Sequence, residues 1–263
     1  MQEKIKSEGK CLFCGKTFAK SGINRHLATH LKEKSKTGKS GKSFLVKVET
    51  KKKWGKTPYF LSLWIDGEAT MDSFDKFLRD IWLECCGHTS AFRDTKNNRS
   101  FAEEFNMMEE SDDMPDNGDE EEYDWLTGGC DDDIPMENKV RDVFYEGLEL
   151  DYEYDFGSTT ALTIAVLYQY PVKADKKIVL LSRNEPLQIV CAICGKKPAT
   201  QICTVCMYDG MAEFCDKCAE KHAKECEDFA DYASMPVVNS PRMGVCAYDG
   251  GTIDRERDGI YKQ

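Results

Sequence analysis

The stretch Cys191–Cys226 reads CAICGKKPATQICTVCMYDGMAEFCDKCAEKHAKEC, and the interpretation of the chain starts from it. It contains three Cys-x-x-Cys pairs, which are followed by one histidine and one further cysteine. Thiolates and imidazole nitrogens at such spacings are typical of structural zinc sites with four protein ligands. We therefore predict two zinc ions. Their ligands are Cys191, Cys194, Cys203, Cys206, Cys215, Cys218, His222 and Cys226.

The spacing leaves two ways of sharing these ligands between the two metals. In a sequential arrangement the first two Cys-x-x-Cys pairs hold one zinc, and the third pair joins His222 and Cys226. In a cross-braced arrangement the first and third pairs hold one zinc, and the second pair joins His222 and Cys226. We favour cross-bracing, because the eight-residue loops between the pairs contain too few apolar residues to form a core for each half. The spacing resembles that of cross-braced B-box and MYND modules.

The compartment decides whether these cysteines bind metal or form disulfides. Disulfides persist in oxidising compartments, and the chain shows no N-terminal apolar signal segment. It also has no apolar run long enough to cross a bilayer. We therefore expect a soluble cytoplasmic protein with no membrane partner, in which the thiols stay reduced. With 263 residues the chain is long enough for one main core and small satellites.

A second metal-binding pattern lies near the N-terminus, where residues 11–30 read CLFCGKTFAKSGINRHLATH. The stretch resembles a two-Cys-two-His zinc finger, although one interval is a residue shorter than usual. Its ligands would be Cys11, Cys14, His26 and His30, which brings the predicted total to three zinc ions. Of the helix positions that face bases in such fingers, only Arg25 carries a side chain suited to base edges.

Charge is distributed unevenly along the chain. Residues 1–56 contain 16 Lys and Arg but only 4 Asp and Glu, whereas the whole chain has a net charge of -11. Such a basic arm favours contact with an anionic partner such as nucleic acid. Alternatively, the arm is simply solvated, or is neutralised by the acidic loop 103–133, which contains 15 Asp and Glu. The candidate nucleic-acid-binding residues are Arg25, Lys32, Lys34, Lys36, Lys51, Lys52 and Lys53.

The middle of the chain has the pattern of an α+β domain. Apolar residues recur at helical spacing over 71–85, and a short helix is predicted at 139–147. Alternating apolar and β-branched residues predict several strands. These strands are expected at 43–50, 58–66, 148–157, 159–171 and 177–183. The predicted fold is thus a central sheet packed on helices and flanked by two small zinc-binding modules.

These patterns divide the chain into four parts. We predict a zinc finger at 1–32, a flexible basic linker at 33–42, the α+β domain at 43–187, and a double zinc module with a C-terminal segment at 188–263.

A family resemblance covers roughly residues 43–187. The segments YFLSLWIDGEATMDSFDKFLRDIWL, GHTSAF and YEYDFGSTTALTIAV resemble the plasmid pRiA4b Orf-three-like family. That family includes passenger proteins of insertion sequences, so the resemblance implies an α+β fold and an association with mobile genetic elements. It implies no chemistry that can be transferred residue by residue.

Several candidate residues remain outside the predicted sites. Cys85, Cys86 and His88 follow the predicted helix at 71–85, but no fourth ligand is evident near them. We therefore expect them to be structural, or to form a redox-sensitive thiol pair. Cys130 and Cys246 are also left unassigned. A loop containing Arg242 is expected to pack against the zinc module or the core.

Three functions are compatible with the sequence. The first is a non-enzymatic zinc protein that contacts nucleic acid with low sequence specificity. The second is a protein-interaction adaptor that uses the C-terminal zinc module. The third, an enzyme using Asp155, His88 or Cys86, is the weakest, because no set of nucleophile, base and orienting group is visible.

Overall fold

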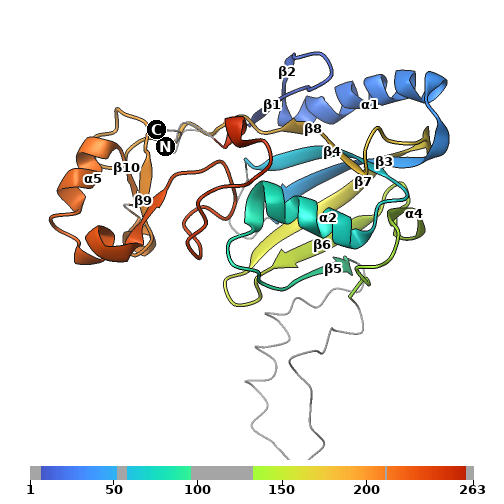
Figure 1. Cartoon of the computed structure of the whole chain (residues 1–263). Coiled ribbons are helices and arrows are strands. Elements are labelled where there is room, and N and C mark those ends of the chain that lie inside the picture. Colours follow the sequence, from blue (N-terminus) through green and yellow to red (C-terminus); the bar gives the residue numbers. More distant parts are fainter. Residues whose placement is uncertain (1–6, 52–57, 96–132, 211, 259–263) are drawn as a thin grey trace, which may run out of the picture.

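The structure of the protein, a computed structural model, describes residues 7–51, 58–95, 133–210 and 212–258 (Figure 1). The acidic loop predicted at 103–133 falls outside this part except for Asp133, as do Lys52, Lys53 and Cys130. Within the described part, the predicted α+β class is confirmed: helices pack against a large antiparallel sheet.

The sheet has six strands in the order β5-β6-β7-β3-β4-β8, and all neighbours are antiparallel. The two central strands, β7 and β3, are also the longest. The strands are β3 (Ser40–Thr50), β4 (Phe60–Asp66), β5 (Ser90–Asp94), β6 (Glu149–Tyr154), β7 (Thr160–Val172) and β8 (Ile178–Arg183). β5 lies at one edge of the sheet and was not among the predicted strands.

Both faces of this sheet are buried, because successive side chains of a strand point to opposite faces. On β3, Phe44 and Val46 join the main core, whereas Leu45 between them joins a second apolar cluster. Helix α2 (Met71–Leu78), continued by the π-helical turn η1 (Arg79–Leu83), packs in the main core. The short helix α4 (Val140–Val143) contributes Val140 to the same core.

Helix α1 (Lys20–Thr37) covers the second face of the sheet. Its buried side chains Ile23, Leu27 and Leu31 lie in one cluster with Trp64 of β4. The hairpin that precedes it is formed by β1 (Glu8–Lys10) and β2 (Thr17–Ala19). The helix runs five residues past position 32, and β3 begins at Ser40. We predicted that residues 33–37 belong to a flexible linker, but they are helical. Burial of Leu31 and its neighbours extends the helix along the sheet.

The C-terminal module is built around a small three-stranded antiparallel sheet in the order β10-β9-β11. Its elements are β9 (Gln201–Cys203), η2 (Cys206–Asp209), β10 (Glu213–Phe214), α5 (Asp216–His222), η3 (Phe229–Ala233) and β11 (Ser234–Pro236). Figure 1 shows this module beside the large sheet rather than stacked on it.

After β11 the chain returns to the α+β domain. Asn239 accepts a hydrogen bond on its carbonyl oxygen from Nη2 of Arg183, at 2.6 Å, and Ser240 donates to the carbonyl oxygen of Trp82 at 2.7 Å. A Cβ atom at Gly251 would lie 2.5 Å from the carbonyl oxygen of Ile81, so only glycine fits at this close backbone approach. The C-terminal segment thus folds back on the core, ending in the 3-10 turn η4 (Arg255–Arg257).

The helices of the described part do not include a membrane-spanning one. None of them is both long enough and apolar enough to span a bilayer.

Candidate metal centres

In the part of the chain that the structure describes, cysteine and histidine side chains gather in four groups, each with four potential ligand atoms within 4.8 Å of one another. Two of the groups lie in the C-terminal module, one at the N-terminus and one where the C-terminal segment meets the α+β domain. Each group has the donor chemistry of a four-coordinate metal site. The donors are four thiols in one group, three thiols and one imidazole in two groups, and two thiols and two imidazoles in the N-terminal group.

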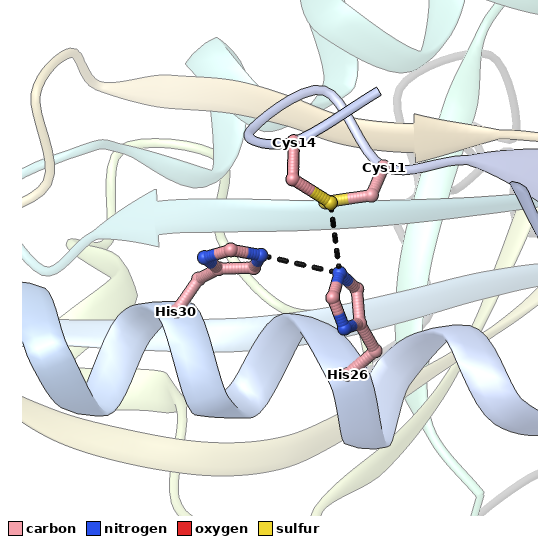
Figure 2. A group of neighbouring side chains, drawn as sticks. All are labelled: Cys11, Cys14, His26 and His30. Atoms are coloured by element: carbon pink, nitrogen blue, oxygen red, sulfur yellow. Dashed lines mark hydrogen bonds between the residues drawn. The ribbon is translucent and has the colours of Figure 1, made fainter. Parts of the chain in front are cut away.

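The N-terminal group joins Cys11 and Cys14 on the β1–β2 hairpin to His26 and His30 on α1 (Figure 2). Nε2 of His26 lies 3.2 Å from Sγ of Cys14 and 3.1 Å from Nε2 of His30. The turn between the two cysteines is closed by a hydrogen bond from the amide of Gly15 to the Cys11 carbonyl, at 2.8 Å. Gly15 has a φ of 75°, which favours glycine.

Packing prepares these side chains for a metal. The Phe18 ring stacks on His26 with centroids 4.1 Å apart, which holds the imidazole in place. Burial lowers the pKa of His26, and His30 lowers it further, so the ring stays neutral and keeps a lone pair for a metal. Burial raises the pKa of the Cys11 thiol, so metal binding there must displace a proton.

The finger does not stand apart from the sheet. The amide of Leu12 in its cysteine turn donates to the carbonyl oxygen of Leu181 in β8, at 2.9 Å. The amide of Glu185 donates to the carbonyl oxygen of Glu8 at 2.8 Å. Together with the packing of α1, these bonds attach the hairpin and helix to the α+β domain as one body.

In the C-terminal module the ligands are interleaved. One group contains Cys191, Cys194, Cys215 and Cys218, and the other contains Cys203, Cys206, His222 and Cys226. This is the cross-braced arrangement, in which each metal would tie the first half of the module to the second. Cys218 and His222 both lie on α5, yet they belong to different groups, so this helix would connect the two metals.

Thiols of the first of these groups differ in pKa, and local hydrogen bonds support the thiolate form at Cys191. Burial acts to raise the pKa of Cys191, but the backbone amides of Cys194 and Cys215 outweigh it and lower the value to about 6. At the same site burial, together with Cys215, raises the pKa of Cys218 to about 12. Crowded thiols of this kind keep a proton until a cation replaces it, so metal binding will release protons.

The second group is supported by aromatic packing. Sγ of Cys206 lies 3.6 Å from Nε2 of His222, and the amide of Cys206 donates to Sγ of Cys203 at 3.4 Å. The His222 ring stacks on Phe214 with centroids 4.3 Å apart, and Phe229 meets it edge-on. These contacts fix the imidazole without using Nε2.

The fourth group was missed by the sequence analysis. Cys85, Cys86 and His88 are joined by Cys246, which is 158 residues beyond His88. The signal was present in the composition, since Cys246 was an unassigned cysteine. Spacing alone does not show that two distant segments meet.

Asp155 and His88, two residues considered for catalysis, lie close together but are otherwise engaged. Nε2 of His88 is 3.5 Å from Oδ2 of Asp155, and it is also within 3.3 Å of Sγ of Cys246. The same carboxylate oxygen of Asp155 accepts a hydrogen bond from the buried guanidinium of Arg242. The arrangement is that of a buried ion pair beside a group of metal ligands.

The candidate nucleic-acid-binding residues occupy different settings. Arg25 and Lys32 are exposed on α1. Lys34 pairs with Asp175, Lys36 with Glu33, and Lys51 with Asp151, at 2.7 to 2.9 Å. Lys34 and Lys36, predicted to belong to a flexible linker, thus lie on helix α1, and Lys51 directly follows β3.

Comparison with known proteins adds little. No protein-family profile matches the chain, and no curated protein matches it. Among solved structures, the chain is similar to the protein of unknown function MM3350 from Methanosarcina mazei Go1. The likeness has a TM-score of 0.34 and 15% sequence identity, and covers 54% of this chain and 67% of that one.

Proposed function

We propose that this is a non-enzymatic zinc-binding protein that contacts nucleic acid electrostatically, with low sequence specificity. The zinc ions act as structural elements, because each predicted site offers four protein ligands and leaves no position for a substrate. Cysteine-rich sets with one or two histidines favour zinc over hard cations such as magnesium, which prefer oxygen ligands.

The observation that carries the nucleic-acid proposal is a basic surface running from α1 to the turn between β7 and β8. The amide of Lys173 donates to the carbonyl oxygen of Lys39 at 2.9 Å, which places the two lysines side by side. With Lys34 they line a hollow of about 480 Å³, which Trp64 and Asp175, the partner of Lys34, also line. Further exposed cations lie on the β1–β2 hairpin, on α1 and in the turn before β8: Lys10, Lys16, Arg25, Lys32, Lys36, Lys176 and Lys177.

This surface suits a phosphate backbone better than base edges. Lysine ammonium groups act as point charges toward phosphate, and phosphate contacts position a protein without reading sequence. Of the candidates, Arg25 alone combines exposure on the outer face of α1 with a guanidinium able to bind a guanine edge. Docking of α1 on the sheet leaves that outer face accessible, because Ile23, Leu27 and Leu31 point the other way.

The test is a binding titration of the full chain with two duplexes of unrelated sequence. We expect similar affinities for both, and a slope of log affinity against log salt of about -0.9 for each phosphate contacted. The double variant Arg25→Ala/Lys32→Ala should weaken binding several-fold. Lys76→Ala, an exposed lysine on α2 at the other face of the sheet, is the matched control and should bind normally. Tight, salt-insensitive binding to one sequence would contradict the proposal.

A second candidate function, protein docking on the C-terminal module, is favoured by exposed apolar side chains. Among the described residues, seven large apolar side chains are exposed, and four of these lie on this module, 39 to 67% exposed: Val190, Ile193, Val205 and Tyr232. Ile193 and Val205 each occupy the turn of a Cys-x-x-Cys pair. Two results together would favour this function. The chain would not bind nucleic acid at low salt, and it would bind a protein partner whose association survives nuclease treatment. Ile193→Ser should abolish that association while the zinc content stays unchanged.

A further inference from the structure

The fourth group of ligands joins two parts of the fold that are far apart in sequence. Cys85, Cys86 and His88 lie in the turn between η1 and β5, whereas Cys246 lies in the C-terminal segment. Sγ of Cys86 is 3.8 Å from Sγ of Cys85 and 3.6 Å from Sγ of Cys246. Nε2 of His88 is 3.0 Å from Sγ of Cys86 and 3.3 Å from Sγ of Cys246.

The sulfur–sulfur distances match a tetrahedral zinc site, and the sulfur–nitrogen distances of 3.0 and 3.3 Å are somewhat shorter than in such a site. Zn–S bonds of about 2.3 Å and Zn–N bonds of about 2.0 Å place two sulfurs about 3.8 Å apart and a sulfur and nitrogen about 3.5 Å apart. A disulfide would instead bring two sulfurs to about 2.05 Å. We propose that Cys85, Cys86, His88 and Cys246 bind a fourth zinc ion, which fastens the C-terminal segment to the α+β domain.

The surroundings of the group complement a zinc ion with three thiolates and one imidazole, whose net charge is -1. Nη2 of Arg242, which also pairs with Asp155, lies 3.7 Å from Sγ of Cys85 and so presents a donor to that thiolate. The turn that presents Cys85 and Cys86 is held by Glu84, whose carboxylate accepts a hydrogen bond from the amide of Gly87 at 2.6 Å. Such outer contacts orient the ligands of a metal.

The backbone at Cys246 indicates what the metal contributes. Cys246 and Ala247 have φ values of 49° and 53°. This left-handed conformation is unfavourable for residues other than glycine. Conformations of this kind persist only where the surrounding structure holds them. A zinc–thiolate bond at Cys246 would hold this turn against the domain, at a point beyond the buried contact between Ser240 and Trp82.

Exposure distinguishes this site from those in the C-terminal module. Cys86 and Cys246 are both exposed, whereas each site of that module contains at least one buried cysteine. Chelators and oxidants therefore reach the fourth site more readily. We expect its zinc to be the first that the protein loses, and the turn around Cys246 to loosen when it leaves.

Metal counting on the full chain tests the proposal. Native mass spectrometry of protein purified with zinc and a thiol reductant should show four zinc ions per chain. The single variants Cys246→Ser and His88→Ala should each show three zinc ions. The control Cys130→Ser replaces a cysteine that belongs to none of the four groups, and it should show four. A misfolded variant would lose more than one zinc ion. A variant therefore supports the proposal only if it keeps the other three ions.

A local readout completes the test. Amide exchange around residues 240–250 should rise in Cys246→Ser and in His88→Ala, and should be unchanged in Cys130→Ser. Three zinc ions in the wild-type chain, or four in both ligand variants, would overturn the proposal. So would a disulfide between Cys86 and Cys246 in protein kept under reductant. The outcome is independent of nucleic-acid binding, which the metal count does not measure.

Discussion

Arg242 and Asp155, 87 residues apart in sequence, form a buried ion pair between the C-terminal segment and the turn after β6. The Arg242 side chain is fully buried, and its Nη1 also donates to the carbonyl oxygen of Ser158 at 2.7 Å. Asp155 has a φ of 62° and accepts bonds on Oδ1 from the amides of Gly157 and Ser158. This pair therefore has a structural role, which assigns the conspicuous Asp155-Phe156-Gly157 run to a turn.

Removing one partner of this pair should destabilise the protein strongly. Arg242→Ala leaves the Asp155 carboxylate buried without its counter-ion, and we expect a loss of about 3 kcal/mol in the free energy of unfolding. The double variant Arg242→Ala/Asp155→Ala should lose less than the two single losses combined, because it removes the unpaired charge. Urea denaturation of the four proteins measures both quantities.

Arg255→Ala is the control for that experiment, because Arg255 is exposed in η4. It should change the free energy of unfolding by less than about 0.5 kcal/mol. Additive losses in the double variant would show that the two residues act separately.

Cross-bracing predicts which ligands fail together. Cys203→Ser should release the metal held with Cys206, His222 and Cys226, and leave the site of Cys191 intact, since the two groups share no ligand. Cadmium-substituted protein should then lose one resonance by cadmium NMR, and the remaining C-terminal signal should couple to four cysteines. A remaining signal coupled to a histidine would instead support sequential pairing.

Metal removal should affect the two parts of the finger differently. The hairpin Glu8–Ala19 contributes one fully buried side chain to the apolar cluster, that of the ligand Cys11, whereas α1 contributes Ile23, Leu27, Ala28 and Leu31, which contact the sheet whether or not metal is bound. After chelation, amide exchange should rise more in the hairpin than in the second half of α1. The metal would thus hold the hairpin, whereas the sheet holds the helix.

Two variants separate metal from packing in that region. Cys14→Ser should loosen the hairpin at small cost to global stability. Leu31→Ala should lower the free energy of unfolding by about 3 kcal/mol, because Leu31 is fully buried between α1 and the sheet. Equal exchange along hairpin and helix in Cys14→Ser would mean that the metal, rather than the sheet, holds α1.

A pH-dependent contribution is expected from Glu49 on β3. Burial acts to raise its pKa, but hydrogen bonds from Lys20 and Lys47 outweigh burial and leave the pKa below its usual value near 4.5. A carboxylate with a lowered folded pKa stabilises the protein above the unfolded pKa, and this contribution is lost as pH falls through the folded pKa. Glu49→Gln should therefore cost about 0.5 to 1 kcal/mol at pH 7 and progressively less below pH of about 4.

Thermal or urea unfolding at several pH values checks this. The difference between wild type and Glu49→Gln should shrink on acidification, whereas a difference that stays constant to pH of about 3 would assign the effect to packing. The salt bridge between Lys20 and Glu49 joins α1 to β3, so the same variant also reports how firmly the helix is held.

Local patterns were sufficient for much of the α+β domain. The helical stripe that begins at Met71 and the alternation over residues 43–50 depend on residues a few positions apart, so periodicity identifies them. The edge strand Ser90–Asp94 was not recognised, because its five residues carry too short a pattern. The helical extent of residues 33–37 was also missed, since that polar segment continues a helix buried at Leu31 and is held by contacts of Lys34 with Asp175 and Trp64, which are distant in sequence.

The sequence by itself determined the ligand types and the α+β class, because Cys-x-x-Cys spacing and apolar periodicity are local properties of the chain. Only the tertiary structure decided how Cys191 to Cys226 are shared between two groups, that α1 covers the sheet, and that Cys246 meets Cys86. The physical reason is the same in each case. Thiols, apolar faces and charges specify what kind of partner they need, whereas the path of the whole chain determines which partner lies within reach.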